Sequence, residues 1–554
     1  MVRSSPSPTE PSKEGAPPTS ELIQNGLAHH QAGRLQEAEA IYQSILKEQP
    51  QHPDALNLLG VIAHQVGKNE IAVNLIENAI KINPTVSYFY NNCGEAYRAL
   101  HKDDLAITRY EQALAIKPDY AEAHNNLGNV LQNLGKLEDA VASYQKAFGI
   151  KPDYAEAHNN LGSALRGLGK LDESLASFRK ALDLNPDYAE AHYNLGNVFQ
   201  ELGQLDEAVA SYNKALKIKP DYAEAYNNMG NALQDKGELA AAIDSYKQAL
   251  KIKPDYAEAY NNMGVALQDK GDLEAAIDSY KQALKIKPDY AEAHYNLYPL
   301  LLDPDDMTPS IKCMKRAVGI KPSRVDFSFF LGMLLDYSGK PQEAKPYFDT
   351  VKYGAAGNRA KLDAWHYIKS AKDNVPTMIG SSIQAFKLGI DAAIIEGLVL
   401  EFGVRFGTSI RQIASLVKQD VHGFDSFEGL PEAWDENPQG SYSTKGVIPS
   451  VPHNVTLHDG WFEETLPGFV KKHPAPVRFM NIDCDIYSST KTVLEIFAKQ
   501  IIPGTVIVFD EYIGNKNWRE DEFKAFQEAV LKHGWEYEYL CFSFMTNQVV
   551  VRLN

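Results

Sequence analysis

Proline recurs every 34 residues between residue 50 and residue 322. The nine prolines stand at positions 50, 84, 118, 152, 186, 220, 254, 288 and 322. Six of them lie in near-copies of Lys-Pro-Asp-Tyr-Ala-Glu-Ala, one of which has Asn in place of Lys. A fixed period of this length is typical of structural repeats, in which each unit buries its apolar face by stacking on its neighbours. The period therefore predicts a stacked array of like units.

Each unit has the pattern of two helices joined by a turn. In the fourth unit, Gly128 and Ala140 are the small residues expected where two helices cross at close range, and Leu127 and Tyr144 are expected to fill the seam. Gly135 stands in the turn, because a residue free to adopt positive φ ends a helix. Proline cannot continue a helix interior, so it marks the passage to the next unit.

A 34-residue unit of this kind resembles the tetratricopeptide repeat. The resemblance covers about residues 19–356 as ten units, and the middle six match closely. The end units drift, with Tyr298 where Gly is expected and Phe330 where Asn is usual. Drift is expected in units that cover exposed helix faces. The family's habit implies a protein or peptide partner. Residues 1–18, rich in Ser, Pro and Thr, are predicted to be a disordered leader.

Asparagine recurs at one position of the first helix in seven consecutive units. These residues are Asn92, Asn126, Asn160, Asn194, Asn228, Asn262 and Asn296. A row of side-chain amides could hydrogen-bond an extended peptide backbone without reading its sequence. Asn is also common at this position of tetratricopeptide repeats in general, which favours a packing role. The row is therefore a hypothesis for peptide binding, with the packing interpretation left open.

From about residue 394 the pattern changes to short β-branched runs alternating with amphipathic stretches, which indicates an α/β sheet with crossover helices. Residues 357–393 are predicted to form a helical connector, and residues 394–554 the sheet domain. The seven predicted strands are 398–403, 421–427, 454–457, 477–483, 505–510, 536–542 and 548–553. The final hairpin is typical of class I methyltransferase sheets, whereas flavodoxin-like and dehydrogenase folds keep alternating. The predicted fold is therefore α + α/β: a repeat superhelix followed by a seven-stranded Rossmann-like methyltransferase domain.

The end of the first strand carries small and hydroxyl residues. Ligands of such sheets bind at the carboxyl ends of the strands, where Glu401, Gly403, Gly407, Thr408 and Ser409 stand. The glycines would let the backbone pass close to a ligand, and the hydroxyls would stand at a helix N-terminus. The spacing is not the Gly-x-Gly-x-x-Gly of dinucleotide sites, so it favours a ligand with an amino-acid end, such as S-adenosylmethionine.

The next two strands also end in acids. Asp425, followed by Ser426, stands 24 residues after Glu401, where an acid can accept both hydroxyls of a ribose. Asp459, Gly460 and Trp461 follow the third strand, and they would place an acid and an aromatic ring beside an adenine. Each acid alone is equally consistent with a helix N-cap. Three such strand ends in succession favour a nucleotide-like cofactor.

The fourth and fifth strands end in the densest group of acids. Asp483 ends one strand, and Asp510 and Glu511 end its neighbour. Carboxylates at this density repel one another and raise one another's pKa unless a cation or protonation offsets their charge. Hard oxygen ligands favour Mg²⁺ or a similar ion. The alternative is a metal-free cluster hydrogen-bonded to the backbone and to water.

Together these motifs resemble the macrocin O-methyltransferase family. The matching segments are 401–409, 424–431, 460–467, 482–490 and 508–512, and the resemblance runs over about residues 380–553. The family consists of class I enzymes that methylate sugar hydroxyls with S-adenosylmethionine and Mg²⁺. The resemblance implies an O-methyltransferase that acts on a sugar, a glycan or a related hydroxyl-bearing metabolite.

Carried over by position, the family's metal ligands fall on Asp483, Asp510 and Glu511. This chain has Asp-Glu-Tyr where the family often has Asp-Asp-Tyr, which puts the position of the ion in doubt. Asp483 or His458 is the candidate for the general base. The polar segment 434–453 is the candidate lid or acceptor loop, with a plain surface loop as the alternative.

Composition excludes several other classes. The formal net charge of −17 argues against a sequence-independent grip on nucleic acid or on an anionic membrane. The four cysteines lie far apart, which favours reduced thiols in a reducing compartment. No uncharged apolar run is long enough to span a bilayer, so a cytoplasmic protein is expected. The composition leaves the oligomeric state open.

Two other interpretations remain. One is an interaction scaffold whose α/β domain is inactive, although no acid of the set is missing. The other is a nicotinamide-dependent enzyme acting on sugars, which the glycine spacing disfavours. Binding of S-adenosylmethionine indicates the methyltransferase, binding of a nicotinamide cofactor indicates the third class of enzyme, and binding of neither favours the scaffold.

Overall fold

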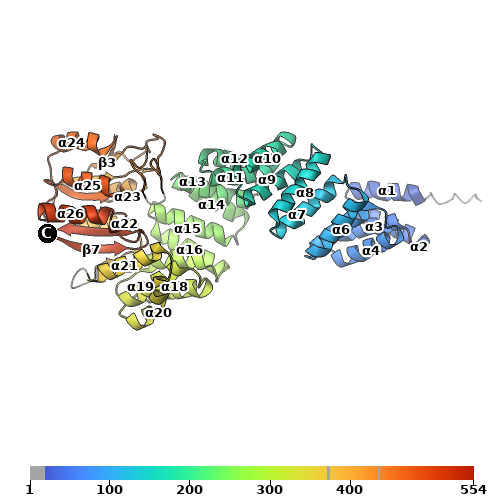
Figure 1. The fold of residues 1–554 in the computed structure, drawn as a ribbon, viewed down its shortest axis with the longest axis horizontal. Helices are drawn as coiled ribbons and strands as arrows, with labels where there is room; N and C mark the ends of the chain where they lie inside the picture. The colour runs from blue at the N-terminus through green and yellow to red at the C-terminus, as the bar shows by residue number, and fades with distance from the viewer. Residues whose placement is uncertain (1–18, 371–374, 435–436) are drawn as a thin grey trace, which may run out of the picture. The chain divides into compact units, whose positions relative to one another are not determined.

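The structure, a computed structural model, describes residues 19–370, 375–434 and 437–554. The predicted leader, residues 1–18, lies outside the described residues. Helices form the N-terminal part of the chain, and a sheet lies in the C-terminal part (Figure 1). Among the described residues, no helix has both the length and the apolar character needed to cross a membrane.

The chain divides into two compact units, residues 1–220 and 221–554. The division falls inside the repeat array, and not at the change of sequence pattern near residue 357. The second unit therefore contains the last repeats together with the sheet. The predicted domain boundaries describe sequence character, and they stay a prediction.

Helix pairs make up the described part of the first unit. Their bounds are α1 Thr19–Gln31, α2 Leu35–Glu48, α3 Pro53–Gln65, α4 Asn69–Ile82, α5 Ser87–Ala99, α6 Asp103–Ile116, α7 Ala121–Asn133, α8 Leu137–Ile150, α9 Ala155–Gly167, α10 Leu171–Leu184, α11 Ala189–Glu201 and α12 Leu205–Ile218. Each pair corresponds to one predicted repeat.

The fourth pair shows why the repeat needs its small residues. A Cβ atom on Gly128 would lie 2.6 Å from the ring of Tyr144, so the two helices cross at this point only with glycine present. Ala140 and Tyr144 are fully buried, and the Tyr144 hydroxyl donates to Asn129 Oδ1 at 2.8 Å. Gly135 ends the turn with φ of 73°. The predicted positions of Gly128, Gly135, Ala140 and Tyr144 are confirmed, whereas Leu127 is half-buried and packs against the cluster of Ala106, Tyr110 and Val130.

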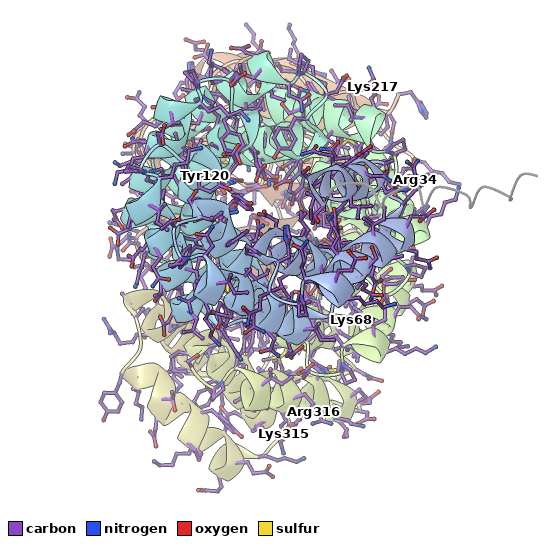
Figure 2. All side chains as sticks on the ribbon, turned by 90° about the vertical axis from the view of Figure 1, so that its right-hand side faces the viewer. Arg34, Lys68, Tyr120, Lys217, Lys315 and Arg316 are labelled. Atoms are coloured by element: carbon purple, nitrogen blue, oxygen red, sulfur yellow. The ribbon has the colours of Figure 1, made fainter. Side chains whose placement is uncertain are left out.

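The Lys-Pro-Asp-Tyr motif has a physical role at the junction between repeats. The ammonium of Lys117 lies 5.0 Å from the centre of the Tyr120 ring, which Figure 2 labels. Lys151 and Tyr154 form the same contact at 4.9 Å in the next repeat. Such a cation–π contact stabilises the turn by about 0.5–1 kcal/mol at an exposed site.

The second unit begins with four more repeats. Their bounds are α13 Ala223–Asp235, α14 Leu239–Ile252, α15 Ala257–Lys270, α16 Leu273–Ile286, α17 Ala291–Leu297 with the 3₁₀ helix η1 Tyr298–Leu301, α18 Thr308–Ile320, α19 Val325–Tyr337 and α20 Pro341–Lys352. The described residues thus contain the ten predicted repeats.

The ninth repeat exchanges the sizes of two facing residues. In the eighth repeat Gly264 faces the ring of Tyr280, whereas 34 residues later Tyr298 stands opposite Met314. Tyr298 and Met314 are both buried. α17 ends after seven residues and continues as η1, which contains Pro299, a residue that cannot continue a helix interior. The drift predicted for the end repeats is therefore a repacking of the core.

The sheet domain follows two helices and a short strand. Its elements are α21 Ala356–Ser370, β1 Thr377–Met378, α22 Ser382–Ala392, β2 Leu398–Phe402, α23 Thr408–Leu416, β3 Val421–Asp425, β4 Val455–Asp459, α24 Phe462–Lys472, β5 Val477–Ile482, α25 Tyr487–Ile496, β6 Val506–Phe509, α26 Glu522–His533, β7 Tyr537–Ser543 and β8 Gln548–Leu553. The strand order is β1-β7-β8-β6-β5-β2-β3-β4. β8 is antiparallel to β6 and β7, and the other neighbours are parallel.

The topology confirms the predicted Rossmann-like domain with a final hairpin, but the strand count was wrong. Over the described residues the sheet has eight strands, because β1 pairs in parallel with β7. β1 lies in the segment 357–393, which the sequence predicted to be helical. A two-residue strand is too short to produce the alternation by which strands are recognised.

The last repeats and the sheet share one hydrophobic core. The rings of Phe329 in α19 and Phe544 after β7 lie 5.2 Å apart, and Trp365 in α21 lies 5.8 Å from Phe542. Phe329, Trp365 and Phe542 are fully buried. Within the second unit, the array is thus part of the fold that carries the sheet.

Gly380 lies where this shared core is tightest, and replacing it with Ala is expected to destabilise the second unit by about 1–3 kcal/mol. A Cβ atom there would stand 1.9 Å from the carbonyl oxygen of Pro299 in η1. Gly468→Ala is the control, because Gly468 lies in α24 with no neighbouring atom within 4 Å. That control is expected to gain up to about 1 kcal/mol from helix propensity. Urea unfolding of both variants tests the contact, and equal stabilities would contradict it.

Candidate active site

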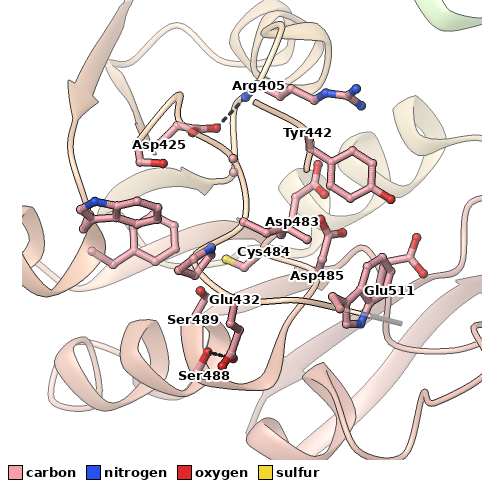
Figure 3. Close-up of a pocket in the computed structure, with 18 of the residues that line it drawn as sticks. Arg405, Asp425, Glu432, Tyr442, Asp483, Cys484, Asp485, Ser488, Ser489 and Glu511 are labelled. Atoms are coloured by element: carbon pink, nitrogen blue, oxygen red, sulfur yellow. Dashed lines mark hydrogen bonds between the residues drawn. The ribbon is translucent and has the colours of Figure 1, made fainter. Parts of the chain in front are cut away.

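A cavity of about 520 Å³ opens at the carboxyl ends of the parallel strands (Figure 3). We call it the first cavity. Asp425, Gly460 and Trp461, from the ends of β3 and β4, line it. Asp483 and Asp485, which follow β5, also line it, and Figure 3 shows them together with Asp425. The predicted strand ends therefore do converge on one site.

The loop after β2 is held close to the sheet by glycine. Gly403 has φ of 92°, and a Cβ atom on it would lie 1.8 Å from the backbone oxygen of Asp483. Gly407 has φ of 77° and stands at the start of α23. Gly403 lines the first cavity, whereas Gly407 lies against Arg411 and Pro449 outside it.

Asp425 holds this loop with its carboxylate. Its Oδ2 accepts the backbone N–H of Val404 at 2.8 Å and that of Arg405 at 2.7 Å, and its Oδ1 accepts the N–H of Phe427 at 2.6 Å. Three of the four lone-pair positions of the carboxylate are thus used. One position remains for a ligand hydroxyl, so the expectation that Asp425 takes both ribose hydroxyls needs correction. Ser426 also lines the cavity.

Glu401 lies in β2 itself, before the loop that follows this strand. It is fully buried, and its Oε1 accepts from the Ser409 hydroxyl and from Asn481 Nδ2. Burial raises its pKa to about 8. Its Oε2 has no partner among the described residues. Glu401 lines neither this cavity nor the smaller cavity described below, and its hydrogen bonds join the start of α23 to β5.

The end of β4 contributes the backbone of Gly460 and the ring of Trp461 to the first cavity, but it does not contribute the carboxylate of Asp459. Gly460 has φ of 128°, and its N–H donates to the backbone oxygen of Asp425 at 3.0 Å. Trp461 lines the cavity beside it. Asp459 is exposed and does not line the cavity, so the acid predicted beside an adenine points elsewhere.

Four carboxyls gather at the ends of β5 and β6. Burial and the neighbouring acids raise the pKa of Asp483 well above its usual value and that of Asp485 to about 7. Burial raises the pKa of Asp510 to about 6, and burial and Asp510 raise that of Glu511 to about 8. Sequence reasoning missed Asp485, although it stands two residues after Asp483. It also missed the fully buried Glu522, which accepts the Glu511 N–H at 3.1 Å.

These acids do not fit a metal held by three protein carboxylates. Asp510 Oδ1 accepts from Gln548, and Asp510 also has a hydrogen bond with Asp483. Glu511 Oε2 is held by Asn547 Nδ2 at 3.1 Å. Among the described residues, no three His, Cys, Asp or Glu side chains come together in a way that could hold a metal ion. The predicted ligand set is therefore not assembled here.

The raised pKa values of these acids make the stability of the ligand-free protein depend on pH, and we expect its second unit to lose stability as pH rises from about 4 to about 8. The folded pKa values of Asp485 and Glu511 lie above those of the unfolded chain. Folding therefore binds protons in this range, and stability falls as pH rises. Asp485→Asn is expected to flatten this dependence, as measured by thermal unfolding at several pH values. Asp391→Asn, on the exposed face of α22, is the control. An unchanged slope in Asp485→Asn would count against the account.

A second cavity of about 240 Å³ reaches the same acids. Asp483 and Asp510 line both cavities. The second cavity is otherwise rich in hydroxyls, and Thr408 and Ser409 at the start of α23 line it. Thus two residues predicted to bind the cofactor lie here, while the other strand ends face the first cavity.

Ser381 and Ser382, at the start of α22, line the second cavity as well. Ser381 is 3% exposed, and its hydroxyl has no partner among the described residues. Two helix N-termini, each with hydroxyl side chains, thus face one small cavity. Helix N-termini attract anions through their unpaired N–H groups and the helix dipole.

His458 lies outside both cavities, which contradicts its prediction as a base. Its Nε2 lies 3.2 Å from His422 Nδ1, and its ring stacks on Phe424 at 4.5 Å. Burial, with His422 and His473 nearby, lowers its pKa to about 4. Successive residues of a strand face opposite sides of a sheet, so a residue one position before the strand end belongs to the packed face.

Two described residues of the segment 434–453 belong to the wall of the first cavity. Trp434 and Tyr442 line the cavity, and Trp434 Nε1 donates to Asp521 Oδ2 at 3.2 Å. The guanidinium of Arg405 lies 5.0 Å from the centre of the Tyr442 ring. Residues 435–436 lie outside the described residues. The role of the segment as a lid or acceptor loop stays a prediction.

The asparagine row lies where neighbouring repeats pack against each other. Asn92 Nδ2 donates to Asn57 Oδ1 of the preceding repeat at 3.1 Å, and Asn160 Nδ2 donates to Asn125 and Asn129 at 3.0 Å each. The same bond to the preceding repeat recurs in five members of the row besides Asn160: Asn92, Asn126, Asn194, Asn262 and Asn296. These amides support packing between repeats, and peptide binding by the row stays a hypothesis.

Comparison with known sequences assigns both halves of the chain. A family model described as a methyltransferase domain matches residues 400–512. A model described as a tetratricopeptide repeat matches residues 29–92, and one described as a TPR repeat matches six segments between residues 94 and 297. A curated relative from Streptomyces olivaceus, 8-demethyl-8-(2,3-dimethoxy-alpha-L-rhamnosyl)-tetracenomycin-C 4'-O-methyltransferase, is 28% identical over 166 residues. The match covers 24% of this chain and 62% of the relative, which is less than two thirds of its length.

Solved structures of repeat proteins resemble parts of the chain. The MamA protein is 31% identical, with 31% of this chain and 94% of that one covered and a TM-score of 0.28. YrrB, described as a TPR protein with an unusual peptide-binding site, is 26% identical, with 34% and 96% covered and a TM-score of 0.30. The sequence matches, and not these low TM-scores, assign the family. The chain is a tetratricopeptide-repeat array fused to a methyltransferase domain.

Proposed function

We propose that this protein is an S-adenosylmethionine-dependent O-methyltransferase whose acceptor is a hydroxyl of a sugar, a glycan or a related metabolite. The observation that carries the proposal is the meeting of two cavities at Asp483 and Asp510. The O-methyltransferase relative, whose name describes a methylated sugar, supports the acceptor class. The repeats are proposed to recruit a protein partner or a protein-borne acceptor.

The two cavities together suit the two ends of the cofactor. The first cavity offers the free lone pair of Asp425, the Ser426 hydroxyl and the ring of Trp461 to an adenosine. The second offers the N-termini of α22 and α23 to a carboxylate. Its buried, unpartnered Ser381 hydroxyl is the polar group that such a ligand would satisfy. Gly403 lets the loop after β2 run close to the backbone of Asp483, which lines both cavities.

Asp483 and Asp510 line both cavities, and at this position their carboxyl groups can accept the proton that the acceptor hydroxyl loses. When bound, S-adenosylmethionine supplies a methyl group on a sulfonium, and the acceptor oxygen displaces the thioether from it. Burial and the neighbouring acids raise the pKa of Asp483 well above its usual value, whereas the pKa of Asp510 is raised only to about 6, which is below neutral pH. Asp510 is then ionised, and its carboxylate takes the proton of the acceptor hydroxyl.

Assistance by Mg²⁺ is the finer part of the proposal, and it rests on donor chemistry alone. Asp483, Asp510 and Glu511 offer hard oxygen atoms, but their present arrangement does not bring three of them to one point. The proton transfer above therefore does not pass through a metal. Addition of a chelator to the active protein tests this part: a complete loss of turnover that Mg²⁺ restores supports it, and unchanged turnover excludes it.

The test of the proposed reaction is transfer of a labelled methyl group from S-adenosylmethionine to acceptors. A panel of free sugars, oligosaccharides and glycoproteins is incubated with the full chain, and S-adenosylhomocysteine is measured as the second product. Label in an alkali-stable ether on one acceptor class, with one equivalent of S-adenosylhomocysteine, is the expected result. Transfer to nitrogen or to a carboxyl would overturn the O-methyltransferase assignment.

A further inference from the structure

The first helix of the eighth repeat forms part of the wall of the second cavity. Gln268 and Asp269, near the end of α15, line the cavity together with Ser381, Thr408 and Ser409. All of these residues lie in the second compact unit. Residues of the repeat array therefore stand beside the two helix N-termini that suit an anion.

A hydrogen bond ties α15 to α23. Gln412 Nε2 donates to the backbone oxygen of Asp269 at 2.7 Å. The Asp269 carboxylate accepts from Gln234 Nε2 of the seventh repeat at 2.9 Å, and burial raises its pKa. Gln412 Oε1 is buried with no partner among the described residues. The junction is thus a polar one, made of groups that need partners.

The turn of the seventh repeat touches the loop after β2. A Cβ atom on Gly237 would lie 3.1 Å from Cβ of Phe406, which stands between Gly403 and Gly407. The turn of the eighth repeat approaches α22, since a Cβ atom on Gly271 would lie 3.9 Å from Ile383. The seventh repeat therefore contacts the loop after β2, and the eighth repeat lies close to the start of α22, which lines the second cavity.

We propose that the seventh and eighth repeats complete the cofactor site, with Gln268 donating to the carboxylate of the cofactor and Asp269 accepting from its ammonium. This inference rests on the proposed function, which places the amino-acid end of the cofactor in the second cavity. Gln268 Oε1 accepts from the Tyr280 hydroxyl at 3.2 Å, so the side chain presents its amide N–H groups as donors.

With these contacts the repeat array is part of the active site, in addition to its proposed role of recruiting a protein partner or a protein-borne acceptor. A cofactor that contacts both α15 and α23 stabilises the junction between them. By linkage, any change in the array that shifts α15 alters cofactor affinity by the same free energy with which the cofactor holds α15 in place.

The experiment compares Gln268→Ala with Gln132→Ala in the full chain. Gln132 occupies the same position of the fourth repeat, and its Oε1 accepts from Tyr144 at 2.9 Å, as Gln268 does from Tyr280. Both variants lose the bond from the tyrosine of the repeat, but Tyr144 keeps a second bond to Asn129 Oδ1, whereas the equivalent position of the eighth repeat is Val265. Gln268→Glu, which keeps the acceptor for Tyr280, therefore separates packing from ligand contact. Titration calorimetry with S-adenosylmethionine is expected to show a Kd about ten- to a hundredfold higher for Gln268→Ala and unchanged for Gln132→Ala.

Gln268→Glu is the second variant, because it keeps the shape and the acceptor for Tyr280 but places a negative charge beside the carboxylate. It is expected to weaken binding at least as much as Gln268→Ala. Hydrogen exchange gives a readout independent of affinity: amides of α15 are expected to gain protection with the cofactor, whereas those of α7 do not.

Equal affinities in all variants, with no added protection of α15, would overturn this inference and leave the proposed function standing. Absence of binding to the wild-type chain would overturn both. Weaker binding in Gln268→Ala and Gln268→Glu, with protection confined to the second unit, is the result that the inference requires.

Discussion

Replacing Asp510 with Asn is expected to lower the rate of methyl transfer by about 10²–10⁴-fold, the usual contribution of a general base. Asn keeps the size of the side chain but cannot take the proton of an acceptor hydroxyl. Asp510 lies where the two cavities meet and is held by Gln548, so the substitution changes charge more than shape. The measurement is single-turnover transfer at saturating cofactor, with an acceptor that the wild-type chain methylates.

Affinity for S-adenosylmethionine is the internal control for that variant. The proposed contacts of the cofactor lie on Asp425, Ser426, Ser381 and Gln268, so its Kd is expected to stay close to that of the wild type. Asp391→Asn, an exposed residue of α22, is expected to change neither quantity. Full turnover by Asp510→Asn would remove the carboxylate pair from the mechanism.

The second large effect is expected at Gly403. Gly403→Ala should destabilise the second unit by about 3–5 kcal/mol and abolish cofactor binding. Two costs add here: φ of 92° disfavours any residue with a side chain, and the new Cβ would lie 1.8 Å from the backbone oxygen of Asp483. Denaturant unfolding and calorimetric titration measure the two consequences.

Gly534→Ala separates these two costs. Gly534 has φ of 67° at the end of α26, and a Cβ atom added there would have no other atom within 4 Å. Its replacement is expected to cost only about 1–2 kcal/mol of backbone strain and to leave cofactor binding intact. If Gly403→Ala were no worse than Gly534→Ala, the close approach of the loop to Asp483 would have no energetic weight.

The repeat array could be predicted in detail because each unit is repeated. A position such as Gly128 is confirmed many times over by its equivalents, and the period shows which residues must face one another. The ninth repeat breaks the pattern, and the reason is a size exchange between Tyr298 and Met314. That exchange could have been found, since the two residues stand where Gly and Tyr stand one period earlier.

The site was predicted at the level of strand ends and less well at the level of side chains. Which strand ends meet follows from the topology, so Asp425, Gly460 and Asp483 were placed correctly at one edge of the sheet. Which way a side chain points depends on register, and a shift of one residue reverses it. His458 lies on the packed face of the sheet for this reason. Asp459 is exposed outside the cavity, and only Gly460 and Trp461 after it line the cavity.

The contribution of the array to the site could not have been read from the sequence. Gln268 and Asp269 match their repeat equivalents in type, since glutamine stands at 234 and aspartate at 235. Only the fold brings Asp269 to Gln412, which follows it by 143 residues in the chain. Among the described residues the three predicted Mg²⁺ ligands do not converge on one point, because neighbouring strand ends do not by themselves bring three carboxylates together. Their role as metal ligands stays a proposal.

Calorimetric titration of the full chain with S-adenosylmethionine tests the central claim most directly. The account predicts one saturable site per chain, weakened by Asp425→Ala in the first cavity and by Ser381→Ala in the second, because one ligand spans both. Competition by S-adenosylhomocysteine at the same site is expected. No saturable binding, or binding that depends on one cavity only, would contradict the account.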